Sequence, residues 1–187
     1  MIRTDVEHCT SDSSHAVANW PRRVNGPMFD VRAVANLVLD VAQKRSVAVT
    51  NMALNKIVFF VHSDYLVEAG SPLVGAKIEA WKHGPVFREI YHEFKTWDDE
   101  PIRGKAKRVN PHSGELEEAT ADFGNEEQFI RELIDRYVHF SAAYLRALSH
   151  RAGGPWHTVW GHDGETNPGM SISNQLILDH HSSEVRQ

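Results

Sequence analysis

The segment from Trp81 to Val86, which reads Trp-Lys-His-Gly-Pro-Val, constrains the local geometry of this chain more tightly than any other. Glycine gives the backbone freedom at position 84, proline fixes φ at position 85, and the indole of Trp81 can hold a strand against a core. Residues 76–82 alternate apolar and polar side chains, which predicts a short, half-buried strand that stops at Gly84 and Pro85. From its residues alone, the segment is an architectural corner.

This corner is expected to lead directly into a helix. Proline suits the first turn of a helix, where its missing amide donor is not needed, so residues 86–94 are predicted to be helical with Ile90 and Phe94 buried. A second tryptophan beside a turn occurs at Gly154, Pro155 and Trp156. It too is interpreted first as a structural corner.

Helical periodicity dominates most of the remaining chain. After Asp30, a candidate N-cap, valines recur at spacings of three and four up to residue 41. A stronger pattern runs from Thr50, a candidate N-cap, to Gly70, a candidate C-cap; residues 57–61 alone suit a strand, but the length of the pattern favours a helix. Further helices are predicted over residues 129–137, after Ser141 and after Ser173.

A hairpin completes the predicted secondary structure. Residues 106–109 and 115–119 flank the turn-forming residues 110–114, which predicts two short strands joined by a loop. Together with the strand before Gly84, these patterns indicate a mainly α fold with a small β element (α+β). We expect a compact helical domain with a short strand and a hairpin.

One folded domain preceded by an extension accounts for the length of the chain. Its 187 residues, 41% hydrophobic and 24% charged, are typical of a single globular domain. Residues 1–27 are rich in Ser, Asn, Pro, Arg and Asp and show no apolar periodicity, so they are predicted to form a flexible N-terminal extension. The folded unit is expected to be residues 28–187, beginning at Met28.

Composition argues against several classes of protein. A single cysteine, Cys9, cannot form an internal disulfide, and the first residues lack the apolar run of a signal peptide, so we expect a cytoplasmic protein. Residues 57–61, the longest strongly apolar run, are far short of the roughly 20 residues that a transmembrane helix needs, so no membrane partner is expected. A net charge of −5 argues against a nucleic-acid binder that uses its whole surface.

No pattern of catalytic residues stands out. Among the twelve histidines, the strongest metal-ligand candidates are His150, His157 and His162 with Asp163, but their spacing matches no zinc motif. No serine lies in a Gly-x-Ser-x-Gly elbow, and no glycine loop matches a phosphate cradle. We therefore expect no catalytic residue, no metal and no cofactor, and a protein that binds a partner rather than an enzyme.

A cluster of basic residues lies on the first arm of the predicted hairpin, at Arg103, Lys105, Lys107 and Arg108. A basic hairpin beside a helical core is one way to contact DNA phosphates. Acidic residues on the second arm can also pair with these cations across the hairpin and neutralise them. The residues alone leave both alternatives open.

Three blocks of the sequence occur in an order shared with a known family: Thr50-Asn51-x-x-Leu54-x-Lys56-Ile57-Val58-Phe59-Phe60, then Glu79 to Val86, then Leu145-x-x-Leu148-Ser149-His150 with Gly154-Pro155-Trp156, followed by Ile172-Ser173. Through these blocks, which span about residues 30–180, the chain resembles the Panacea domain of SocA-like antitoxins, also labelled phage-associated proteins. It departs from the family pattern at Ser149, where threonine is common, and at Gly153, where an acidic residue is more usual.

The resemblance implies an antitoxin that binds and neutralises a small toxin encoded in the neighbouring gene, with the Panacea domain as a scaffold adapted to unrelated toxins. One member of the family is also a proteolytic adaptor that delivers its toxin to the ClpXP protease, which makes a ClpXP-type protease a second implied partner. Regulation of its own operon through the basic hairpin is the alternative function. The family motif residues are the implied partner-binding positions: Thr50, Asn51, Lys56, Trp81, His83, Gly84, Pro85, Val86, Ser149, His150, Pro155 and Trp156.

Overall fold

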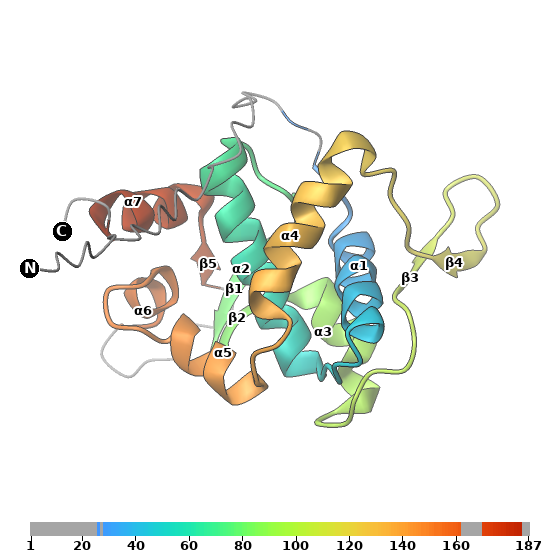
Figure 1. Cartoon of the computed structure of the whole chain (residues 1–187), viewed down its shortest axis with the longest axis horizontal. Helices are drawn as coiled ribbons and strands as arrows, with labels where there is room; N and C mark the ends of the chain where they lie inside the picture. Colours follow the sequence, from blue (N-terminus) through green and yellow to red (C-terminus); the bar gives the residue numbers. More distant parts are fainter. Residues whose placement is uncertain (1–25, 27, 162–169, 185–187) are drawn as a thin grey trace, which may run out of the picture.

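The computed structural model describes residues 26, 28–161 and 170–184 (Figure 1). The predicted extension, residues 1–27, lies outside the described residues except for Gly26. The elements follow in the order α1 (Val31–Lys44), α2 (Asn51–Ala69), β1 (Ile78–Trp81), β2 (Gly84–Phe87), α3 (Arg88–Phe94), η1 (Lys95–Trp97), β3 (Lys107–Val109), β4 (Leu116–Glu118), η2 (Gly124–Glu126), α4 (Glu127–Tyr137), α5 (Ala142–Ser149), α6 (Pro155–Trp160), β5 (Ser171–Ile172) and α7 (Asn174–Glu184). The mainly α fold with a small β element is confirmed.

Helix α2 is the centre of the fold. It contacts α1, α3, α4, α5, α7 and β2, and Figure 1 shows it between the other helices. Its N-cap is Thr50, whose side chain accepts a hydrogen bond from the Ala53 amide at 3.3 Å, and it ends at Gly70 in the left-handed conformation with φ 74°. Residues 57–61 are therefore helical. The cap and the C-terminal glycine stand where the sequence predicts them.

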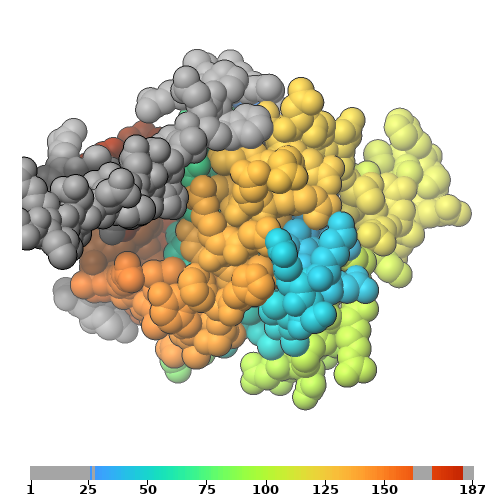
Figure 2. All heavy atoms as spheres, in the orientation of Figure 1, coloured from blue at the N-terminus to red at the C-terminus, as the bar shows by residue number. Residues whose placement is uncertain are grey.

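Three of the helices around α2 also begin at the predicted caps. Asp30 caps α1, Ser141 caps α5, and the Ser173 hydroxyl accepts a hydrogen bond from the Leu176 amide at the start of α7. Figure 2 shows α4 and α5 covering one face of the molecule, with α1 beside them. None of the helices in the described ranges is both long enough and apolar enough to cross a membrane.

Strand β1 is the middle strand of an antiparallel sheet with the order β2-β1-β5. The sequence predicts a half-buried strand, and this is wrong for Glu79, which is 4% exposed. Its carboxylate lies 3.3 Å from the Arg88 guanidinium and 3.5 Å from the Lys77 ammonium, and it accepts a hydrogen bond from the Trp81 indole at 2.9 Å. A carboxylate with these partners can be buried where alternation alone predicts exposure.

The prediction that a helix begins at Val86 is also wrong. Residues 84–87 form β2, which pairs antiparallel with β1, and the helix begins only at Arg88. Pro85 is tolerated because β2 lies at the edge of the sheet, where an amide donor is not required. Ile90 and Phe94 are buried on α3 as expected.

The basic residues lie on or beside a confirmed hairpin. β3 pairs antiparallel with β4, and Figure 1 shows this hairpin projecting from the body of the molecule beyond α1. Besides β2, which was predicted as helix, four elements were not predicted: α6, because six residues are too few for a clear periodic pattern, the two-residue strand β5, and the three-residue 3-10 turns η1 and η2.

Helix α7 is tied to α2 by a buried histidine. The His62 ring is 1% exposed, and its Nε2 lies 2.9 Å from Asn174 Oδ1. Because His62 Nδ1 accepts a hydrogen bond from the Val74 amide, Nε2 carries the proton and donates to Asn174. Burial lowers the pKa of His62, so the ring is held in this neutral form.

Candidate functional site

The three sequence blocks meet at one point of the fold. Lys56 of α2 is 1% exposed, and its ammonium donates a hydrogen bond to the Pro85 carbonyl at 2.9 Å. Gly84 has φ 105°, and a Cβ atom there would lie 2.6 Å from Lys56 Cε and 2.7 Å from Ser149 Oγ. The close approach of α2 and α5 to β2 therefore requires glycine at this position.

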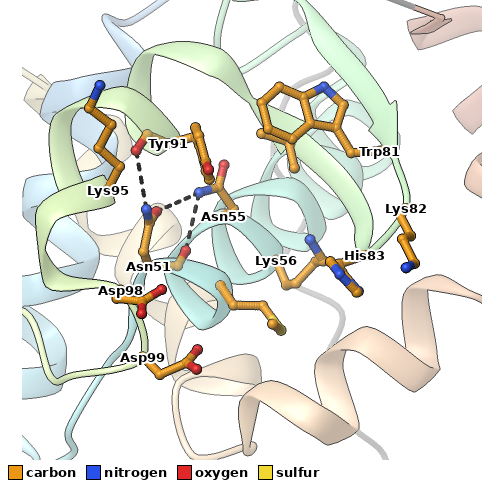
Figure 3. A pocket seen from close by; sticks show the side chains of 12 residues that line it. Asn51, Asn55, Lys56, Trp81, Lys82, His83, Tyr91, Lys95, Asp98 and Asp99 are labelled. Carbon is orange, nitrogen blue, oxygen red and sulfur yellow. Dashed lines mark hydrogen bonds between the residues drawn. The ribbon is translucent and has the colours of Figure 1, made fainter. Parts of the chain in front are cut away.

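Two asparagines extend this contact along the first turns of α2. Asn55 accepts a hydrogen bond from the Phe87 amide at 3.0 Å and donates one to Asn51 Oδ1 at 3.0 Å. Asn51 in turn donates to the Tyr91 carbonyl at 3.1 Å, as the dashed lines in Figure 3 show for the bonds among the drawn residues. These bonds fix β2 and α3 against α2.

The C-terminal block supports the same strand pair from the other side. The Trp156 indole is 5% exposed and donates a hydrogen bond to the Trp81 carbonyl at 2.9 Å. The His150 ring stacks on it at 3.7 Å between centroids, and Pro155 occupies the first turn of α6. Burial, with the charges of Arg146 and Lys56 nearby, lowers the pKa of His150 to about 4, so this ring is neutral. Trp156 and His150 thus serve the architecture.

Trp81 is placed differently from Trp156. Its indole is only partly buried and meets the Tyr91 ring edge-on at 4.8 Å between centroids. The sequence assigns Trp81 the role of a clamp on the core, but in the structure the buried indole at this corner is that of Trp156. The Trp81–Tyr91 pair is therefore available to a partner.

A pocket of about 400 Å³ opens beside this aromatic pair (Figure 3). It is lined by Asn51, Met52, Asn55, Lys56, Trp81, Lys82, His83, Val86, Tyr91, Lys95, Asp98 and Asp99. Five of the family motif residues, Asn51, Lys56, Trp81, His83 and Val86, are among them. Thr50 lies just outside as the cap of α2, and Gly84, Pro85 and Ser149 form the buried support behind Lys56.

The two ends of the pocket differ in charge. Figure 3 shows Asp98 and Asp99 on the side near Asn51, and Lys82 and His83 on the opposite side. Burial, together with the positive charge of Arg146, lowers the pKa of Lys56 to about 7. The pKa of His83 is lowered by desolvation and by the charges of Arg146, Lys82 and Lys56.

Lys56→Met is expected to remove a pH dependence of stability. The lysine pKa is near 10.5 in the unfolded chain and about 7 in the folded one, so between these pH values the unfolded state binds more protons. Raising the pH therefore stabilises the wild type, whereas below pH 7 the cost of burying the charge is fully present. From pH 7 to 9.5 the free energy of unfolding is expected to rise by roughly 2–3 kcal/mol in the wild type and not in Lys56→Met.

Urea unfolding across this pH range measures the effect. Lys107→Met, which removes an exposed lysine on the hairpin, is the control and is expected to keep the wild-type slope. Equal slopes in Lys56→Met and the wild type would contradict the buried, charge-sensitive environment of Lys56.

The four basic residues near the hairpin do not reach the pocket. Lys105 is paired with Asp40 and donates to the Asn36 carbonyl, and Arg108 pairs with Glu117 across the hairpin at 3.2 Å. The predicted neutralisation by the second arm thus holds for Arg108, whereas Lys105 is neutralised by α1. Arg103 and Lys107 are exposed, and neither has an ion pair in the part of the chain that the structure describes.

The residues considered as metal ligands are not gathered into a site. Within residues 26, 28–161 and 170–184, no group of three His, Cys, Asp or Glu side chains is arranged to hold a metal ion. His150 is stacked on Trp156, and His157 Nδ1 accepts a hydrogen bond from the Gly153 amide at 3.4 Å. His162 and Asp163 lie outside the described residues.

Seven pocket residues are not among the predicted site residues: Met52, Asn55, Lys82, Tyr91, Lys95, Asp98 and Asp99. The last two follow η1 in a charged stretch that sequence alone cannot distinguish from a solvated surface. Tyr91 offered one signal in the sequence, because it is an aromatic residue between Ile90 and Phe94, the positions predicted to be buried on a helix. In the structure Tyr91 is 37% exposed.

Comparison with known proteins identifies relatives over most of the chain. The family described as "Antitoxin SocA-like, Panacea domain" matches residues 54–157. Among curated proteins, the chain is 37% identical over 156 residues to "Antitoxin SocA" of Caulobacter vibrioides (strain NA1000 / CB15N), an alignment that covers 80% of this chain and 81% of that relative. No solved structure matches the chain.

Proposed function

The chain belongs to the family of SocA-like antitoxins with a Panacea domain, and on this basis we propose that it neutralises a cognate toxin by binding it directly. The observation that carries the proposal is the 37% identity, across most of both chains, with a protein named as an antitoxin. The toxin is expected to be the product of the neighbouring gene, and the chain to act by binding rather than by catalysis.

The surface around the pocket is the proposed contact with the toxin. Trp81 and Tyr91 are partly exposed aromatic residues, the kind that contributes most to binding energy at protein interfaces. Their backbones are held by Trp156 and Asn51, which donate hydrogen bonds to the Trp81 and Tyr91 carbonyls. A surface that is already rigid before binding loses little conformational entropy in the complex, which favours tight association.

Growth of cells that express the neighbouring gene tests the proposal. The neighbour alone is expected to arrest growth, and co-expression of the wild-type chain to restore it, while a frameshifted copy of the chain does not. A neighbour that is harmless by itself would overturn the antitoxin function. Restoration by the frameshifted copy would show that the protein is not the neutralising agent.

The family resemblance extends the proposal to proteolysis. After binding, the chain would deliver its toxin to a ClpXP-type protease, so the half-life of the toxin should be shorter in cells that contain the chain. Deleting the protease should restore the half-life without abolishing binding. An unchanged toxin half-life would restrict the function to neutralisation by binding.

Binding to promoter DNA through the hairpin is the second candidate function. Arg103 and Lys107 favour it, because both are exposed and neither forms an ion pair with a described residue. The ion pairs of Lys105 and Arg108 oppose it. It predicts binding to the promoter of the gene that weakens as salt rises. The absence of a mobility shift with this DNA at low salt would dismiss it.

A further inference from the structure

We propose that the basic end of the pocket, here defined as the lining residues Lys56, Lys82 and His83 together with the neighbouring Arg146 outside the lining, binds an oxyanion, and that in the complex this group is a carboxylate of the toxin. The second half of the inference rests on the proposed antitoxin function. The first half concerns the chain alone and is tested without a toxin.

The positive charges at the basic end form no ion pair with a carboxylate among the described residues. Lys56 comes from α2, Lys82 and His83 from the turn between β1 and β2, and Arg146 from α5. Among the described residues, no carboxylate forms an ion pair with Lys56, Lys82 or Arg146. The charges that lower the pKa values of Lys56, His83 and the adjoining His150 all come from basic side chains of this cluster, with Arg146 acting on all three. Such a cluster lowers its electrostatic energy by binding an anion.

Lys56 also has donors beyond the one hydrogen bond that its ammonium makes within the described residues. An ammonium group has three donors, and the Pro85 carbonyl accepts from one of them at 2.9 Å. The side chain is 1% exposed and lines the pocket, so solvent does not fully compensate its charge. An oxyanion in the pocket would accept the remaining donors and supply the missing negative charge, forming a charge-assisted hydrogen bond.

The shape and charge of the pocket favour a single carboxylate over a polyanion. Asp98 and Asp99 lie on the side opposite Lys82 and His83, where they would repel an extended chain of phosphates (Figure 3). A volume of about 400 Å³ accommodates an acidic side chain or a C-terminal residue. The aromatic Trp81 and Tyr91 at the same pocket would contact the apolar atoms of the residue that carries the carboxylate.

Binding is expected to be linked to the protonation of Lys56. An anion stabilises the charged ammonium, so its affinity should be highest below pH 7, where Lys56 is already protonated, and should fall at higher pH. His83 and His150 face the same region, and protonation of either ring at low pH would act in the same direction.

Calorimetric titration of the full chain with sodium acetate and with inorganic phosphate, at constant ionic strength, tests the site. Saturable binding is expected at pH 6, with a Kd at least tenfold weaker in the double variant Lys82→Met with Arg146→Met. Both side chains are exposed, so the variant is expected to fold. The control is Arg103→Met with Lys107→Met, which removes the same two kinds of charge near the hairpin and should leave the Kd unchanged.

The outcomes separate the two halves of the inference. No saturable binding to the wild type, or an equal loss in the control, overturns the oxyanion site whatever the toxin does. A tenfold or greater loss of toxin affinity in the Lys82→Met/Arg146→Met variant supports the toxin carboxylate as the bound group. If this variant loses acetate but keeps toxin affinity, the site takes a free oxyanion and the carboxylate assignment is overturned. A wild type that binds acetate but no toxin refutes the antitoxin function instead.

Discussion

Gly84→Ala is expected to destabilise the protein by roughly 2–6 kcal/mol, because a left-handed φ and overpacking of a buried contact each cost about 1–3 kcal/mol. The backbone at Gly84 has φ 105°, and an added Cβ would lie 2.6 Å from Lys56 Cε and 2.7 Å from Ser149 Oγ. Both neighbouring residues are themselves buried, so neither can move away without disturbing α2 or α5. Urea unfolding at pH 7 measures the change.

Gly114→Ala is the matched control for this prediction. Gly114 also has a positive φ, 73°, but nothing lies within 4 Å of the position that its Cβ would occupy. Its substitution therefore adds backbone strain without a steric conflict and is expected to cost only about 1 kcal/mol. Equal losses in the two variants would show that backbone conformation alone, and not the approach of Lys56 and Ser149, makes glycine necessary at position 84.

Trp81→Ala combined with Tyr91→Ala is expected to weaken toxin binding by at least about 100-fold, the scale expected when two aromatic hot-spot residues are truncated. Because both rings are partly exposed, the loss of folding stability should stay near 1–2 kcal/mol. Toxin affinity measured by calorimetry, together with urea unfolding of the same protein, separates the two effects.

Two further variants calibrate this result. Trp156→Ala removes the buried indole of the same corner and is expected to cost about 3–5 kcal/mol of stability. Phe140→Ala removes an exposed aromatic ring, 40% accessible, that precedes α5, and toxin affinity should be unchanged. If Trp81→Ala with Tyr91→Ala folds normally and binds the toxin as the wild type does, the pocket face is not the contact surface.

Local signals in the sequence are sufficient to predict five of the helices, α1, α2, α4, α5 and α7. For α2, a capping threonine, a long apolar period and a terminal glycine agree with one another, and the structure uses all three. The hairpin of β3 and β4 is predicted for the same reason, since its turn residues are adjacent in sequence to the strands that they join. In both cases the deciding contacts lie within the segment itself.

Tertiary contacts decide the features that sequence reasoning predicts wrongly. Pro85 suits the first turn of a helix as well as it suits an edge strand. It lies in a strand because β1 pairs with residues 84–87, which places β2 at the edge of the sheet. The burial of Glu79 depends on Arg88, which belongs to another element. Neither partner can be read from local periodicity.

The candidate site was only partly predictable for the same reason. The family motif includes Lys56, Trp81 and His83, which line the pocket, but also Gly84 and Ser149, which support it from behind. The sequence gives no way to separate these two sets. Trp81 and Trp156 both stand beside Gly-Pro turns, and only the packing of α6 against β1 buries one and leaves the other partly exposed.

Hydrogen–deuterium exchange of the full chain, alone and saturated with the product of the neighbouring gene, tests the central claim most directly. If the chain neutralises this protein through the pocket face, amides of the turn at residues 82–83 and of the segment 95–99 should become protected. The hairpin loop at residues 110–114 should exchange as in the free chain. No protection anywhere at saturating concentration, or protection confined to the hairpin, would contradict the account.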